Sequence, residues 1–254
     1  MKRVMLVVAY EGTEYMGWQV QPGRVTVEHV LNQALSGLLG EEIRVIGASR
    51  TDSGVHSLGN VAVFDTNARM PADKISYALN QRLPEDIVVQ QSREVAGDFH
   101  PRKCKSTKTY EYRILNRRFP MPTFRRDTYF YYRPLDVAAM QEAASYLVGR
   151  HDFKSFCSIH TQARDTVREI YDCQVIADEG AVPEGRLVTI RVQGSGFLYH
   201  MVRIIAGTLI QVGLGEVEPA RLKDILEAKD REAAGPTAPA CGLTMMGIAF
   251  EEKS

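Results

Sequence analysis

The first hundred residues carry a pattern of apolar and polar positions that predicts strands and helices in a definite order. Residues 4–9 form a short apolar run typical of a strand. Apolar side chains then recur every three or four positions over residues 26–39, where Thr26 is the expected N-cap. We also expect strands at residues 43–48, 60–64 and 87–91 and a second helix at residues 71–81. The resulting order, β-α-β-β-α-β, is that of the split βαβ unit.

The remaining residues repeat this order with longer connections. We expect strands at residues 107–115, 167–176, 187–192 and 243–250, and helices at residues 136–148, 197–214 and 219–228. Two related halves, residues 1–102 and 103–254, therefore account for the chain. Clefts between domains are favoured ligand sites, so we expect a binding cleft where the two halves meet.

Composition and local pattern argue against a membrane protein and a secreted one. Of the 254 residues, 44% are hydrophobic and 24% are charged, as in an ordinary globular protein. The apolar run after Arg3 is too short for a signal peptide, because Glu11 follows it closely. The most apolar long stretch contains His200 and Arg203, which favours a buried helix over a membrane span.

The cysteines indicate a reducing compartment. Cys104, Cys157, Cys173 and Cys241 are widely scattered and form no CxxC pair, so no disulfide framework is predicted and a cytoplasmic protein is expected. Cys157 and His160 have a spacing that a metal ion can use, but no second pair of ligands supports them, and we expect no metal site.

Positive charge is concentrated in one part of the chain, although the formal net charge is zero. Residues 99–133 contain ten lysines or arginines and only two acidic residues, interleaved with aromatic side chains. This combination is typical of a surface that follows phosphates and stacks on bases. An exposed loop beside a strand with ordinary core aromatics explains the same pattern equally well.

The segment Gly47–His56 carries the candidate chemistry. Asp52 follows Arg50 by two residues in a turn rich in glycine, and an aspartate held ionised in such a turn can act as a nucleophile. Asp-Ser-Gly is also ordinary turn chemistry. Arg203, in the middle of an apolar helix, either reaches the surface or pairs with a carboxylate, for which Asp52 is the candidate.

The chain resembles the tRNA pseudouridine synthase A family over nearly its whole length. The resemblance rests on an ordered set of motifs: Tyr10-Glu11-Gly12, Gly17-Trp18-Gln19, Gly47 to His56, Asn80 with Leu83 to Ile87, Phe99 to Arg102, Lys108 to Tyr112, Asp152-Phe153 with Ser155-Phe156, and His200 to Arg203. Two positions depart from the family pattern, Ser53 where alanine is usual and Asn60 where glutamine is frequent. Both flank the reactive groups, so they bear on fine specificity.

The resemblance implies an α+β fold in which two ferredoxin-like or RRM-like βαββαβ halves form a continuous, mostly antiparallel sheet with a central active-site cleft. It implies an enzyme without cofactor or metal, acting as a homodimer on uridines at tRNA positions 38 to 40 in the anticodon arm. The first half would carry the catalytic Asp52, with Arg50 contacting the substrate. The second half would carry the basic partner Arg203 and two substrate-binding residues, Tyr110 and Leu243.

Pseudouridine formation breaks the N1–C1′ bond of uridine, turns the uracil and rejoins it through C5. The target base must first leave the stack. Arg50 can fill the vacated space and Tyr110 offers a ring for the extruded uracil. For His56, a hydrogen bond that holds the loop is favoured over acid–base catalysis. The alternatives are a non-catalytic RNA-binding or RNA-folding protein, and a nucleoside hydrolase, for which a second acid is lacking.

Overall fold

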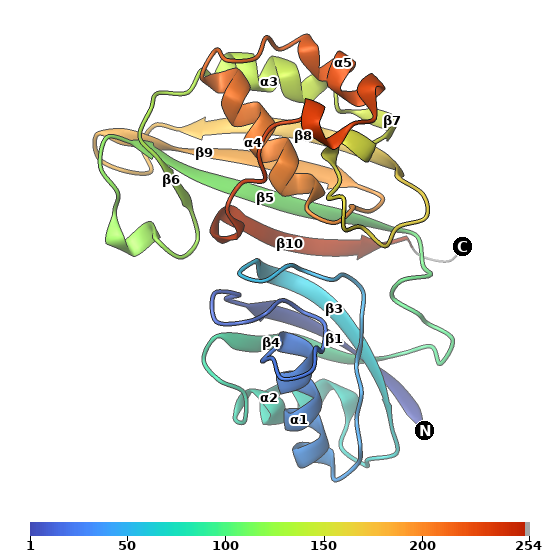
Figure 1. Ribbon diagram of the computed structural model, residues 1–254. Coiled ribbons are helices and arrows are strands. Elements are labelled where there is room, and N and C mark those ends of the chain that lie inside the picture. The colour runs from blue at the N-terminus through green and yellow to red at the C-terminus, as the bar shows by residue number, and fades with distance from the viewer. Residues whose placement is uncertain (252–254) are drawn as a thin grey trace. The chain divides into compact units, whose positions relative to one another are not determined.

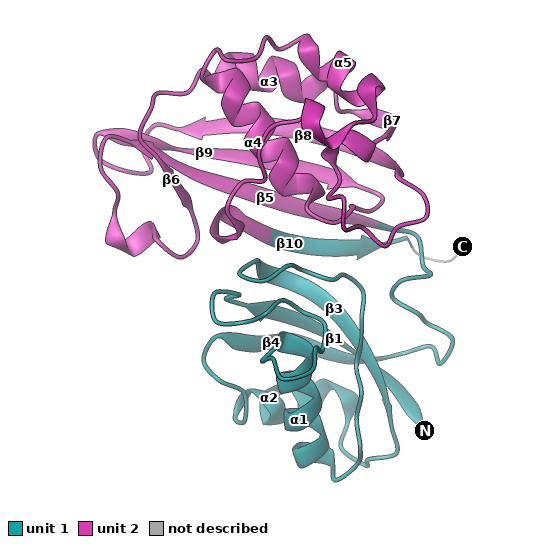
Figure 2. Ribbon diagram, viewed as in Figure 1, with its two compact units in different colours: residues 1–106, 245–254 teal, residues 107–244 magenta. Residues whose placement is uncertain are grey.

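The computed structural model describes residues 1–251 and divides the chain into two compact units (Figure 2). Unit 1 comprises Met1–Ser106 and Met245–Ser254, and unit 2 comprises Thr107–Thr244. The sequence instead predicts a boundary after residue 102 and assigns everything later to the second half. The two divisions differ at the end of the chain, where the residues from Met245 onward belong to unit 1. This return of the chain to its first unit is not visible in the order of elements along the sequence.

Unit 1 follows the predicted β-α-β-β-α-β order. Its elements are β1 (Lys2–Tyr10), α1 (Val27–Leu39), β2 (Ile46–Gly47), β3 (His56–Thr66), α2 (Ala72–Asn80) and β4 (Ile87–Val95). Strand β1 lies between β3 and β4 and is antiparallel to both. Strand β10 (Leu243–Phe250), the last of the chain, neighbours β3.

The core of unit 1 follows from the alternation of side chains along β1. Val4, Leu6 and Val8 are fully buried and belong to the cluster that includes Leu31 of α1 and Ile75 of α2. The intervening side chains point to the opposite face of the sheet, where Met5 packs with Val61 and Val63. Because the side-chain period of a strand is two, the same strand supplies both layers.

Helix α1 begins and ends as its sequence predicts. The Thr26 side chain accepts a hydrogen bond from the His29 amide at 3.3 Å, and Gly40 ends the helix in the left-handed conformation. The strand expected at residues 43–48 is wrong in length, because only Ile46–Gly47 pair with β3. The backbone amides just before β2 instead donate hydrogen bonds to side chains of α1. The Ile43 amide donates to Ser36, and the Val45 amide donates to Asn32.

Unit 2 is also built on mostly antiparallel strands. Its strands are β5 (Ser106–Arg117), β6 (Tyr129–Tyr131), β7 (Gly149–Asp152), β8 (Val167–Asp178) and β9 (Gly185–Gly194), and its helices are α3 (Val137–Ser145), α4 (Met201–Gly213) and α5 (Arg221–Ala228). The strand order is β5-β9-β8-β7, and β6 alone is parallel, on β5. Helices α3 and α4 pack on each other and cover the sheet (Figure 1). These two units confirm the α+β class with mostly antiparallel strands.

Three details of unit 2 differ from the sequence prediction. The short strands β6 and β7 are not predicted, since neither carries an alternating pattern. Helix α4 begins at Met201 rather than Phe197, because His200 has a φ of 63° and its left-handed backbone cannot continue a helix in the N-terminal direction.

Over residues 1–251, no helix has the length and apolar character needed to span a membrane.

Candidate active site

The candidate residues divide between the two units. Arg50 and Asp52 belong to unit 1, and Tyr110, Arg203 and Leu243 belong to unit 2. Each group is built by its own local structure.

Asp52 lies in a tight turn between β2 and β3. The Val55 amide donates to the Asp52 carbonyl at 3.2 Å, and Gly54 has a φ of +76°, which glycine adopts without strain. The Asp52 side chain is half-buried and Arg50, two residues earlier, is exposed. The turn therefore has the ordinary Asp-Ser-Gly chemistry and also presents a carboxylate and a guanidinium at its surface.

A neighbouring stretch, residues 10–18, clamps this turn, and we call it the clamp segment. The Trp18 amide donates to the Thr51 carbonyl at 3.1 Å, and the Gly54 amide donates to the Tyr15 carbonyl at 3.3 Å. The hydroxyls of Tyr10 and Thr51 are hydrogen-bonded at 2.7 Å in a buried position. These bonds fix the residues on both sides of Asp52.

The clamp segment is itself hydrogen-bonded to Asp86, the residue directly before β4. The Tyr15 hydroxyl donates to Asp86 Oδ1 at 2.6 Å, and the Glu11 amide donates to the Asp86 carbonyl at 2.9 Å. Burial, and secondarily the hydrogen bond to Asp86, raise the pKa of Tyr15 well above its usual range, so this hydroxyl stays a donor at physiological pH.

Two glycines allow the clamp segment to approach the turn closely. A Cβ on Gly12 would lie 2.0 Å from the Val55 carbonyl oxygen, and a Cβ on Gly17 would lie 2.6 Å from the Thr51 carbonyl oxygen. Gly17 also has a φ of +83°. Side chains at these positions would push the turn that carries Asp52 away from its support.

His56 holds the start of β3 against the clamp segment. Its Nδ1 accepts a hydrogen bond from the Gly12 amide at 3.0 Å, and the residue is only 6% exposed. A ring nitrogen that accepts must be unprotonated, so the proton of the neutral imidazole lies on Nε2. Within residues 1–251, Nε2 has no hydrogen-bond partner. This arrangement agrees with the predicted loop-holding role.

The two residues that depart from the family pattern, Asn60 and Ser53, both form hydrogen bonds next to the Asp52 turn. Asn60 is fully buried, and its Nδ2 donates to the Ser49 carbonyl at 3.0 Å while its Oδ1 accepts from the Val61 amide at 2.9 Å. The Ser53 hydroxyl donates to the Tyr15 carbonyl at 3.2 Å. Asn60 thus supports the chain just before Arg50, and Ser53 adds one more bond between the turn and the clamp segment.

In unit 2, Tyr110 lies on β5 opposite Val192 of β9 and is 6% exposed. Its ring meets that of Phe197 edge to face, with centroids 5.1 Å apart. An edge-to-face contact of this kind favours one orientation of the Tyr110 ring.

Arg203 projects from the first turn of α4. Its Nε donates to the Ala238 carbonyl at 2.8 Å, and the Ala238 amide donates to the Arg203 carbonyl at 3.1 Å. Burial raises the pKa of Tyr112 far above its usual range, and the positive charge of Arg203 acts in the opposite direction. Arg203 is therefore held by backbone in a half-buried position, and its predicted pairing with Asp52 stays a prediction.

Leu243 is buried and opens β10, directly after the one-turn helix Ala240–Gly242. The adjacent Gly242 allows a close approach, since a Cβ there would lie 2.7 Å from the ring of Tyr112. The Tyr112 hydroxyl donates to the Pro239 carbonyl at 2.8 Å. The loop before Leu243 is thus tied to β5.

The clamp segment is the part of the site whose role the sequence did not reveal. Four of its residues, Tyr10, Gly12, Gly17 and Trp18, occur in the motifs that carry the family resemblance. No pattern in these motifs indicates that they support a turn some forty residues later.

Among residues 1–251, no three histidine, cysteine or acidic side chains gather in a way that could hold a metal ion.

Comparison with known proteins identifies the family. A sequence model described as tRNA pseudouridine synthase matches residues 6–102 and 143–251. Proteins named tRNA pseudouridine synthase A are 47% identical in Thermoanaerobacter sp. (98% of this chain and 100% of the relative) and 48% identical in Brevibacillus brevis (98% and 100%). The one from Myxococcus xanthus is 42% identical over 99% of this chain and 93% of the relative. The chain thus belongs to the tRNA pseudouridine synthase A family.

Proposed function

We propose that this tRNA pseudouridine synthase, an isomerase, converts uridine to pseudouridine in the anticodon arm of tRNA, at positions 38, 39 or 40, and that Asp52 is the catalytic residue. The observation that carries the assignment is the turn at Asp52. Its backbone is bonded on both sides to the clamp segment, through Thr51 and Gly54, so the carboxylate is presented from a rigid support. Preorganised groups of this kind are what catalysis by orientation requires.

The reaction exchanges one bond for another within the substrate. The N1–C1′ bond breaks, the C5–C1′ bond forms, the hydrogen on C5 is lost as a proton and N1 gains one, so no electrons or groups are required from outside. Asp52 can attack the ribose, attack the base or remove a ribose proton. Each role needs an ionised carboxylate, and Arg203 is proposed as its basic partner.

The remaining residues are proposed to bind the substrate. Arg50 is exposed beside Asp52 and can occupy the space that the extruded base leaves. Tyr110, fixed by Phe197, would stack on the uracil, and the buried Leu243 would line the uracil pocket. This assignment requires the two units to form one cleft with a continuous sheet, as the family resemblance implies.

Two further expectations accompany this function. The enzyme is proposed to act in the cytoplasm, in agreement with four free cysteines, and as a homodimer, which follows from the resemblance alone. Analytical ultracentrifugation of the purified protein tests the dimer directly.

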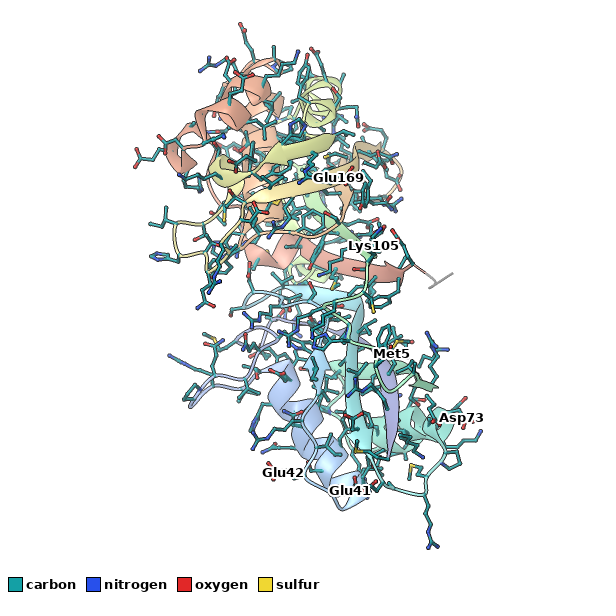
Figure 3. All side chains as sticks on the ribbon, turned by 90° about the vertical axis from the view of Figure 1, so that its right-hand side faces the viewer. Met5, Glu41, Glu42, Asp73, Lys105 and Glu169 are labelled. Carbon is teal, nitrogen blue, oxygen red and sulfur yellow. The ribbon has the colours of Figure 1, made fainter. Side chains whose placement is uncertain are left out.

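The decisive experiment compares Asp52→Asn with wild type on an unmodified tRNA transcript, without added metal or cofactor. Pseudouridine is mapped by carbodiimide treatment and primer extension. Asp73→Asn is the matched control, because Asp73 is an exposed aspartate of α2 in the same unit (Figure 3). Wild type and the control should give stops on the 3′ side of the anticodon arm, and Asp52→Asn should bind tRNA without producing them.

Other outcomes would change the assignment in separate ways. Turnover by Asp52→Asn within tenfold of wild type would remove Asp52 from the chemistry. Binding of tRNA without pseudouridine from any of the three proteins would favour the non-catalytic RNA-binding alternative.

A further inference from the structure

A groove outside the candidate active site lies at the far end of β5 in unit 2. Its volume is about 380 Å³. Three arginines line it, namely Arg117 at the end of β5, Arg118 directly after that strand, and Arg186 on β9. Tyr132 and two glutamates, Glu179 and Glu184, also line it. We call it the arginine groove. A groove of this size accommodates a ligand as large as a nucleotide.

One arginine of the groove is part of its wall. Arg186 donates from Nε to Asn116 Oδ1 at 3.3 Å, from Nη1 to Glu179 Oε1 at 3.0 Å, and from Nη2 to the Leu135 carbonyl. These bonds use both arms of its guanidinium, and they neutralise one of the two glutamates. Arg186 therefore shapes the groove without being available to a ligand.

Arg117 and Arg118 differ from Arg186 in their interaction partners. Among the residues that the structure describes, neither Arg117 nor Arg118 forms a salt bridge, and the buried Nε of Arg117 has no hydrogen-bond partner. Arg118 is exposed, with its guanidinium 5.0 Å from the ring centroid of Phe119. The exposed Glu184 alone opposes these two charges in the lining, so the groove favours an anion.

The backbone leaves room beside Arg117. Gly185 pairs with Arg117 across the strands, and a Cβ on Gly185 would lie 2.4 Å from the Cβ of Arg117. A larger residue at position 185 would displace the base of the arginine side chain. Two guanidinium groups in such a setting suit the geometry of a phosphate.

An aromatic platform lies on the same groove. Tyr132 is 66% exposed, and its ring is stacked on that of Tyr131 with centroids 6.4 Å apart. Asn116 fixes the backbone on both sides of it, donating to the carbonyls of Tyr131 at 3.0 Å and of Arg133 at 2.7 Å. An exposed ring on a fixed backbone is the arrangement on which single-stranded bases stack.

We propose that the arginine groove binds one nucleotide of the substrate tRNA at a point remote from the reacting uridine, with the phosphate on Arg117 and Arg118 and the base on Tyr132. The inference rests on the proposed function. Arg117 lies seven positions after Tyr110 on β5, a distance of about 23 Å along an extended strand. The groove therefore serves binding, and the groove residues take no part in the chemistry.

The test measures tRNA affinity between 50 and 200 mM salt, and the single-turnover rate at saturating tRNA, for Arg117→Gln/Arg118→Gln, Tyr132→Ala and Tyr132→Phe. Matched controls from unit 1 are Arg44→Gln, whose side chain is 83% exposed, and Tyr77→Ala, whose residue is 71% exposed. Because Arg118 is exposed, Arg118→Gln alone keeps the test valid if the double variant does not fold.

The double variant should bind tRNA at least tenfold more weakly and lower the slope of log affinity against log salt by about 0.7 or more. Tyr132→Ala should weaken binding about 5-fold to 100-fold, and Tyr132→Phe should restore it, since the ring face and not the hydroxyl is used. Rates at saturation should equal that of wild type.

Affinities and salt slopes equal to those of Arg44→Gln and Tyr77→Ala would overturn the inference. Failure of the proposed function has a different signature, because it would appear as wild-type protein that binds tRNA in a groove-dependent manner and yet forms no pseudouridine.

Discussion

Gly17 links a backbone conformation directly to the candidate catalytic turn. Its φ of +83° is one that an alanine adopts only with strain, and a Cβ would lie 2.6 Å from the Thr51 carbonyl oxygen and 3.1 Å from the Asp52 carbonyl carbon. Ordinary contacts begin near 3.4 Å. The substitution Gly17→Ala therefore has to move the turn by roughly 0.8 Å or distort the clamp segment.

The expected loss of stability has two parts. A left-handed backbone at a non-glycine residue costs about 1–2 kcal/mol. The steric conflict with Thr51 adds about 1–3 kcal/mol, as overpacking does elsewhere. Gly23→Ala provides a matched control, because Gly23 has a φ of +68° but a Cβ there would meet no atom within 4 Å. The difference between the two variants isolates the conflict with the turn.

The effect on catalysis follows from the same displacement. A misplacement of about 1 Å can lower a rate about 100-fold, so Gly17→Ala should reduce the single-turnover rate by about 10-fold to 100-fold at saturating tRNA. Gly23→Ala should keep the wild-type rate. Urea unfolding can be followed by the fluorescence of Trp18, the one tryptophan of the chain, which lies in the clamp segment and is 2% exposed.

Two results would refute this reasoning. If Gly17→Ala and Gly23→Ala lose the same free energy of unfolding, the close approach to Thr51 does not strain the folded protein. If folded Gly17→Ala forms pseudouridine at the wild-type rate, the clamp segment does not set the position of Asp52.

Two further predictions concern titration. Hydrogen bonds from Arg3 lower the pKa of Asp65, so this carboxylate stabilises the fold above pH of about 4, and the contribution is lost as pH falls through the native pKa. Asp65→Asn should thus lower Tm most near neutral pH and approach wild type in acid; a difference independent of pH would contradict this. Burial raises the pKa of Cys173 to about 12, so a thiol reagent at pH 8 should modify Cys104, which is partly exposed, and spare Cys173 until urea is added. Peptide mass spectrometry measures both sites, and equal labelling in native protein would refute the prediction.

The sequence by itself determined the elements that depend on local interactions. The cap of α1 at Thr26 and the apolar face of that helix are properties of adjacent residues, and both occur as predicted. Strand β10 has the predicted bounds, Leu243–Phe250, because an apolar run between turns specifies a strand whatever its partner is. The ordered motifs were also sufficient to identify the family, since each is a short stretch of sequence.

Tertiary structure decided the features that depend on residues far apart. Strand β6 exists because Tyr129–Tyr131 find β5 as a partner, and the predicted strand at residues 43–48 is shortened because Asn32 and Ser36 take its amides. The support of Asp52 by residues 10–18 and the groove of Arg117 and Tyr132 belong to the same class. Hydrogen bonds and close contacts between distant segments leave no periodic trace in the sequence, because folding alone brings their partners together.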